Sequence, residues 1–159
     1  MDIIEKIRDI DCYLKHITAS RPPVIPEEAL NQLEITRDVS HEIDLPKRKS
    51  DHFSVAVTDK ITFTPHEGPF QIEVVIGASI FLTEPLSPQE ITRLVKMRKN
   101  ILSILNQCLP HSSAIIAHIT DKMGFSPMIF SSRIALNKTR ELRNASRLSS
   151  RRTKWKVLT

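Results

Sequence analysis

Three segments in which apolar and polar residues alternate constrain the fold of this chain more than any other feature. They lie at residues 33–45, 53–64 and 70–83. A period of two places the apolar side chains on one face of an extended chain, so each segment predicts a half-buried antiparallel strand. Two charged residues, Arg37 and Asp59, stand in the rows where an apolar side chain is expected.

Two helices are predicted after these strands. The first begins at Ser87, which forms a capping box with Glu90, and it is expected to end before Pro110 because proline cannot continue a helix. The second is predicted over residues 111–124, with a glycine at the left-handed position that closes many helices. The order of elements predicts an α+β fold: a small antiparallel sheet of long strands with two C-terminal helices on one face.

An additional helix is predicted at the N-terminus, over residues 1–20. Ile3, Ile7 and Ile10 open a row of apolar residues spaced by three or four positions, which is typical of one face of an amphipathic helix. The prolines of residues 21–31 predict a stiff linker between this helix and the rest of the chain.

The remaining sequence divides into a body, residues 32–132, and a basic C-terminal tail, residues 133–159. The tail holds nine of the 23 Lys and Arg residues but only one of the 18 acidic residues, Glu141, so the rest of the chain is weakly acidic although the net charge is +5. Such a tail is either a solvated segment or a nucleic-acid-binding segment that neutralises phosphates.

The sequence contains no motif that indicates an enzyme. Its three glycines cannot form a phosphate-binding loop, and Cys108, His111 and His118 lack a fourth metal ligand. We therefore expect no catalytic residue, no cofactor and no metal. With Cys12 and Cys108 far apart in the sequence, acidic residues near the start and no apolar run long enough to span a membrane, we expect a cytoplasmic protein without a disulfide framework.

The second half of the chain shows an ordered series of segments. The long strand "PFQIEVVIGASIFLTE" leads into an acidic, proline-containing turn, and an amphipathic segment then ends in the "LP" of residues 109–110. The helix "HSSAIIAHITDKMG" follows, and after it comes the proline-stiffened apolar loop "GFSPMIF". This series resembles the SecB family of protein-export chaperones and their relatives.

The resemblance implies an ATP-independent chaperone, or holdase, that binds unfolded polypeptide and assembles as a homotetramer, a dimer of dimers. Its client would be an export precursor, with docking to the export motor, or an antitoxin. The basic tail favours the antitoxin branch, because export members are typically acidic. Two alternatives remain: a nucleic-acid-binding module acting through the tail, and an oligomeric assembly subunit without a client.

Two sets of apolar residues are the candidate contact sites. The candidate client-binding residues are Phe81, Phe125, Met128, Ile129 and Phe130. The candidate oligomer contacts are Ile91, Leu94, Leu102, Ile3, Ile7 and Ile10. The loop can instead be a cap over the core beneath the helices, in which case its phenylalanines would be buried.

Overall fold

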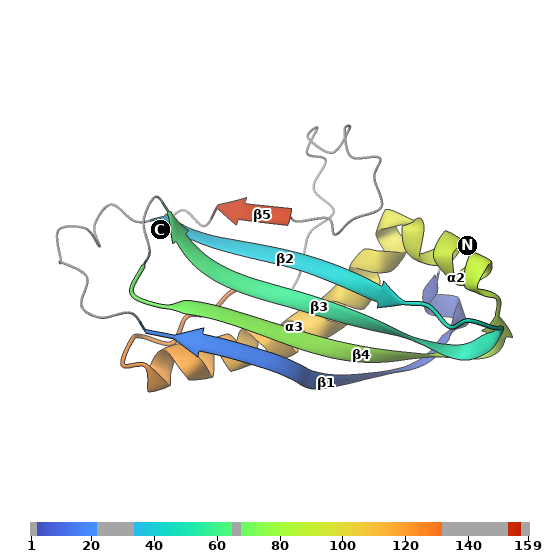
Figure 1. The fold of residues 1–159 in the computed structure, drawn as a ribbon, viewed down its shortest axis with the longest axis horizontal. Coiled ribbons are helices and arrows are strands. Elements are labelled where there is room, and N and C mark those ends of the chain that lie inside the picture. Colours follow the sequence, from blue (N-terminus) through green and yellow to red (C-terminus); the bar gives the residue numbers. More distant parts are fainter. Residues whose placement is uncertain (1–2, 22–33, 65–67, 132–152, 157–159) are drawn as a thin grey trace.

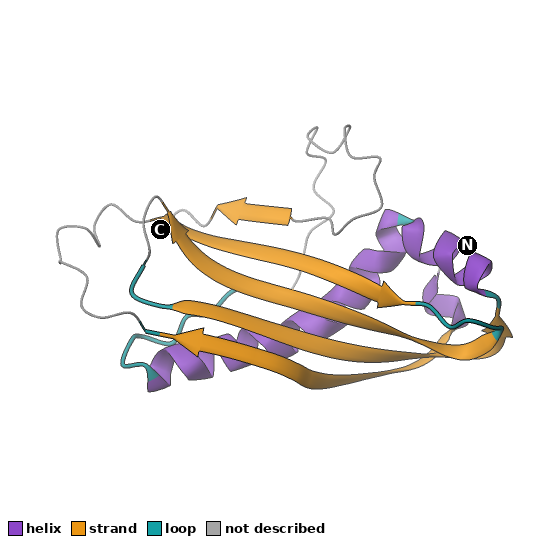
Figure 2. Ribbon diagram, in the orientation of Figure 1, coloured by secondary structure: helices purple, strands orange, loops and turns teal. Residues whose placement is uncertain are grey.

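The structure, a computed structural model, describes residues 3–21, 34–64, 68–131 and 153–156. An antiparallel sheet with strand order β1-β4-β3-β2-β5 carries two helices on one face (Figure 1; Figure 2). The predicted α+β fold is confirmed. The elements are η1 (Ile3–Lys6), β1 (Ile7–Ser20), β2 (Glu34–Asp44), β3 (Ser50–Thr64), β4 (Gln71–Leu86), α2 (Pro88–Lys96), α3 (Arg98–Lys122) and β5 (Thr153–Lys156).

The core lies between the sheet and the helices. Every second residue is buried over residues 53–61 of β3 and 72–82 of β4, as the alternation predicts. Figure 1 shows α3 running obliquely behind the sheet, from α2 to the end of β1. The largest fully buried side chains on these elements include Ile61, Ile72, Ile76, Ile80, Leu82, Ile91, Ile104, Leu109 and Ile116.

The prediction of an N-terminal helix over residues 1–20 is wrong. Residues Ile7–Ser20 form β1, which pairs with β4 along its length, and only Ile3–Lys6 form a short 3-10 helix. The linker predicted at 21–31 lies outside the described residues except for Arg21, and so does the tail except for residues 153–156, which form β5 beside β2.

Two irregularities in β1 explain why its sequence resembles a helix. The pairing with β4 shifts register between Ile7 and Asp9, and again between Leu14 and His16. A bulge of this kind lets residues three apart share one face of a strand, while residues four apart share a face in any strand. The row Ile7, Ile10, Leu14 and Ile17 therefore faces the helices from a strand, opposite Leu82, Ile80, Ile76 and Val74.

The helices divide at a different residue from the predicted one. Pro110 lies inside α3, on its exposed side, and the break falls at Met97. The fully buried Asn100 holds this corner, because its side-chain amide donates a hydrogen bond to the Leu94 carbonyl at 2.8 Å. The predicted capping box at the start of α2 is confirmed, with Ser87 and Glu90 bonded reciprocally.

Candidate functional site

The segment after α3, residues 124–131, returns across the helix-covered face of the sheet and is the candidate site; we call it the loop. Gly124 has a φ of 86°, which favours glycine. The Phe125 amide donates to the Thr120 carbonyl and the Gly124 amide to the Asp121 carbonyl, both at 3.0 Å. This pair of bonds is a Schellman motif, which ends the helix and reverses the chain, as the glycine predicts.

The first anchor of the loop is Phe125, which packs near the end of β1. Its ring centroid lies 5.2 Å from that of Phe70, and the guanidinium of Arg21 lies 5.1 Å above it. Arg21 also donates a hydrogen bond of 2.8 Å to the Met123 carbonyl. Phe125 is half-buried in this position, so it supports the loop and stays partly accessible.

The second anchor is a backbone hydrogen bond at Met128. Its amide donates to the hydroxyl of Thr120 at 2.9 Å. Thr120 is fully buried and its hydroxyl donates in turn to the Ile116 carbonyl at 3.0 Å. Met128 itself is half-buried against the core. This hydrogen bond joins the chain that follows Pro127 to α3.

The third anchor joins the end of the loop to β2. One guanidinium nitrogen of Arg37 donates to the Ser131 carbonyl at 2.6 Å, and the guanidinium lies 5.2 Å from the Phe130 ring centroid. Phe130 is only 8% exposed. It therefore belongs to the core, as the alternative interpretation of the loop expects, and supports the loop from below.

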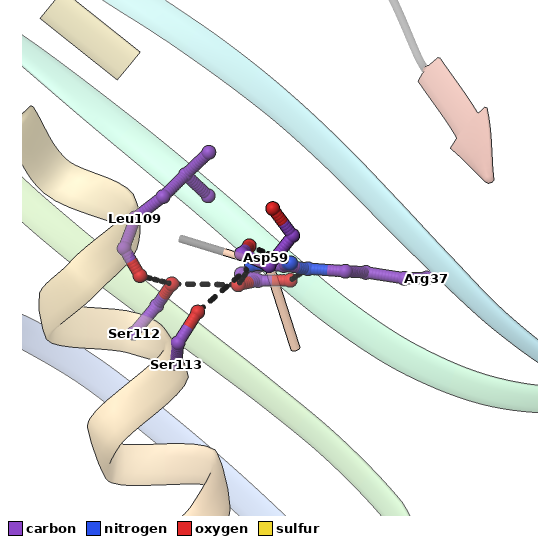
Figure 3. A network of polar contacts seen from close by, with 6 residues as sticks. Arg37, Asp59, Leu109, Ser112 and Ser113 are labelled. Atoms are coloured by element: carbon purple, nitrogen blue, oxygen red, sulfur yellow. Dashed lines mark hydrogen bonds and ion pairs between the residues drawn. The ribbon is translucent and has the colours of Figure 1, made fainter. Parts of the chain in front are cut away.

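Arg37 is itself fixed by a buried network of polar groups (Figure 3). Its Nε and Nη2 donate to the two carboxylate oxygens of Asp59 at 2.9 and 2.7 Å. Ser112 donates to the same carboxylate at 2.6 Å, and Ser113 accepts from Arg37 at 3.2 Å. A bidentate ion pair of this kind is among the stronger ion pairs in proteins. The end of the loop is therefore bonded to a rigid network that joins β2, β3 and α3.

The sequence pattern could have revealed this network. Arg37 and Asp59 interrupt the apolar rows of two neighbouring strands. Opposite charges that both face a core are stable there only as a pair. The two serines could not be found in this way, because nothing in the apolar pattern of the α3 sequence marks Ser112 as a partner of Asp59.

Ile129 is the member of the loop that stays outside the core. Its side chain is 85% exposed, whereas its neighbours Met128 and Phe130 are half-buried and buried. The loop thus holds one large apolar side chain in solvent on a segment bonded at both ends. Leu14 and Ile17, on the helix-facing side of β1, are 50% and 37% exposed, so the cover of the core is also thin at this edge.

The structure does not bring Phe81 together with the loop. Phe81 lies between the buried residues Ile80 and Leu82 of β4 and therefore points to the opposite face of the sheet. There it packs with the His52 ring, at 6.3 Å between centroids, and with the guanidinium of Arg8, 5.9 Å from the ring.

The residues expected at an oligomer contact lie mostly inside a single chain. Ile91, Leu94 and Leu102 are buried in the core, and Ile7 and Ile10 are half-buried against it. Ile3 falls in η1, where the side chain lies outside the description. The apolar stripe of the helices is therefore covered by the chain's own sheet, to which β1 adds width.

The described residues contain neither a cluster of metal-ligating side chains nor a helix that could cross a membrane. No group of three or more His, Cys, Asp or Glu side chains there could hold a metal ion; Cys108 is buried, whereas His111 and His118 point to solvent. Within the same residues, none of the helices has the length and hydropathy that crossing a membrane requires.

Comparison with known proteins bears on the fold of the chain. No protein-family model and no curated protein matches the chain. Among solved structures, it is similar to the SecB-like chaperone Rv1957 of Mycobacterium tuberculosis in complex with a ChAD peptide from the Rv1956 HigA1 antitoxin. The TM-score is 0.57 at 12% identity, over 81% of this chain and 88% of that chain. This chain has a SecB-like fold. The SecB-like fold agrees with the resemblance seen in the sequence.

Proposed function

We propose that this chain is an ATP-independent chaperone that binds an apolar segment of an unfolded polypeptide at the loop. Ile129, Met128 and the partly accessible Phe125 make the contact, and the buried Phe130 supports the loop from the core. Phe81 lies on the other face and takes no part in this surface. The similar structure holds an antitoxin peptide, so an antitoxin is the first client class to test and an export precursor the second.

The observation that carries this proposal is the 85% exposure of Ile129 on a loop that is bonded to α3 and β2. A large apolar side chain in solvent has a favourable free energy to gain when a partner covers it. Because the loop is ordered before binding, less conformational entropy is lost when a client binds. Methionine adds a flexible contact that adapts to different client side chains.

The expected contribution of Ile129 can be given a size. Burying an isoleucine side chain contributes about 1.5 to 3 kcal/mol. Its replacement by serine should therefore raise the dissociation constant for a client by roughly tenfold or more. The folded state should be almost unaffected, since the side chain makes little contact with the core.

Binding can be measured by fluorescence anisotropy with a permanently unfolded client, dye-labelled lactalbumin that has been reduced and carboxymethylated. The variant Ile129→Ser should weaken binding, while Leu45→Ser serves as the matched control. Leu45 is also an exposed apolar residue, 37% accessible, but it follows β2 and is not part of the loop. Unchanged affinity in Ile129→Ser, or equal losses in both variants, would contradict the proposed site.

A further inference from the structure

The two cysteines of the chain, distant in sequence, lie side by side in the structure. Cys12 is on β1 and Cys108 on α3, and their sulfur atoms are 3.9 Å apart. They are the only two cysteines in the sequence. Their proximity does not depend on the proposed chaperone function, and no part of the loop contributes to it.

The backbone around the pair is suited to bring the sulfurs closer. Cys12 faces the helices from the middle of β1, opposite the small residue Ala78 of β4. A disulfide needs a sulfur separation of about 2 Å. The two sulfur atoms must therefore move closer together by about 2 Å. β1 is an edge strand that pairs only with β4 within the described sheet, so a small shift of β1 and rotation of both side chains can supply the approach.

The two thiols differ in access to solvent. Cys12 is half-buried, whereas Cys108 is fully buried. Burial raises the pKa of the Cys108 thiol to about 12. Burial also raises the pKa of Cys12, and the Asp11 carboxylate adds to that increase. Neither thiol is readily ionised at neutral pH, so a reagent should meet Cys12 first and react slowly.

We propose that Cys12 and Cys108 form an intramolecular disulfide that fastens the edge strand β1 to α3 when the chain meets a disulfide oxidant such as oxidised glutathione. The Cys12 thiolate attacks one sulfur of the oxidant, which gives a mixed disulfide and releases one glutathione thiolate. Cys108 loses its proton and attacks the Cys12 sulfur, which releases the second glutathione. Two electrons pass from the cysteines to the oxidant, and the two cysteine protons end on the two glutathione thiols.

Such a bond would have a measurable effect on stability. It would close a chain segment of about a hundred residues, and closing a loop of that size lowers the conformational entropy of the unfolded chain. The oxidised form should melt at a temperature about 10 °C above that of the reduced form. Reduction by dithiothreitol should reverse the shift.

The test uses the purified full chain in buffers that contain reduced and oxidised glutathione in a series of ratios. Thiols are counted with Ellman's reagent after denaturation, and intact mass spectrometry distinguishes the products. The expected product is a monomer whose mass is lower by two hydrogen atoms and which has no free thiol. Two free thiols at every ratio, a stable glutathione adduct in the wild type, or a cross-linked dimer would each overturn the proposal.

Single replacements separate the role of Cys12, which attacks the oxidant, from the role of Cys108, which closes the disulfide. Cys108→Ala preserves an apolar core and should stop at a glutathione adduct on Cys12. Cys12→Ser should remain unmodified over the same time, because Cys108 is shielded. An adduct that forms equally fast on Cys108 in the Cys12→Ser variant would contradict the assigned order of attack.

Discussion

Helix α3 is joined to the two flanks of the sheet by contacts of opposite character. Toward β2 and β3, Ser112 and Ser113 meet the ion pair of Arg37 and Asp59, and every group in that network is hydrogen-bonded. Toward β1, one turn earlier on the helix, the thiol of Cys108 lies 3.9 Å from the thiol of Cys12. The first contact is fixed by charge, and the second can change its strength with the redox conditions.

The difference shows how a fold of this kind can hold a loop firmly and an edge strand loosely. The charged network reaches through Arg37 to the carbonyl of Ser131, so the flank at β2 fixes the end of the loop. The flank at β1 carries partly exposed apolar residues, and the strand itself meets α3 at the pair of thiols; the hydrogen bond from Arg21 to the Met123 carbonyl lies beyond the end of the strand. Breaking each flank separately should therefore have different consequences.

The largest effect is expected from breaking the charged flank. Arg37→Met leaves the Asp59 carboxylate buried without its partner, which should lower the free energy of unfolding by about 3 to 5 kcal/mol. Urea denaturation measures this value. Adding Asp59→Leu removes the buried charge and should recover a large part of the loss. The matched control is Lys60→Met, which removes an exposed ion pair with Glu73 at 3.8 Å and should cost less than about 1 kcal/mol.

The next largest effect should appear within the loop that this flank supports. Phe130→Ala creates a cavity beside Arg37 and should destabilise the fold by about 3 kcal/mol, near the lower limit for a buried phenylalanine. Ile129→Ala, one residue earlier, should change the stability by less than about 0.5 kcal/mol because the side chain is exposed. Equal losses in thermal or urea unfolding would show that the loop is not divided into a buried and an exposed side.

The sequence predicted the charged flank only in part, and the β1 flank not at all. Alternation placed Arg37 and Asp59 on inward faces, but their pairing depends on strand register, which a single sequence does not specify. The pattern of β1 predicts a helix because two bulges give the strand the apolar spacing of a helix. The proximity of Cys12 and Cys108 follows from that unrecognised strand.

The sequence predicts the position of the apolar loop, but it does not show which residues of the loop are buried and which are exposed. Nothing in "GFSPMIF" distinguishes Phe130, which is buried under Arg37, from Ile129, which is exposed. The break between the helices was expected at Pro110, yet the buried amide of Asn100 places it at Met97. In the loop the deciding contact is long-range, from Arg37 to Phe130, whereas at the helix break it joins two residues six positions apart.

A smaller effect is expected at the β1 flank from Gly77. A Cβ atom at this position would lie 2.4 Å from the ring of Tyr13 on β1. Tyr13 is 47% exposed and can move, so Gly77→Ala should cost only about 1 to 2 kcal/mol. In a chain that already carries Tyr13→Ala, the same replacement should be neutral or stabilising, because glycine is unfavourable within a strand. A cost that persists without the Tyr13 ring would place the steric conflict elsewhere.

The smallest effect is expected at an exposed charged contact, the cap of α2, which tests whether burial gives the charged flank its strength. Ser87→Ala should lower the free energy of unfolding by about 1 kcal/mol.

Hydrogen bonds from the Ser87 amide and hydroxyl lower the pKa of Glu90 from its ordinary value of 4.5. A lowered pKa in the folded state means that the carboxylate stabilises the fold above pH 4.5 and that this contribution is lost as the pH falls through the folded-state value. The difference in unfolding free energy between the wild type and Glu90→Ala should therefore be constant near neutral pH and shrink in acid. A difference that stays constant down to low pH would mean that the carboxylate charge contributes nothing at this cap.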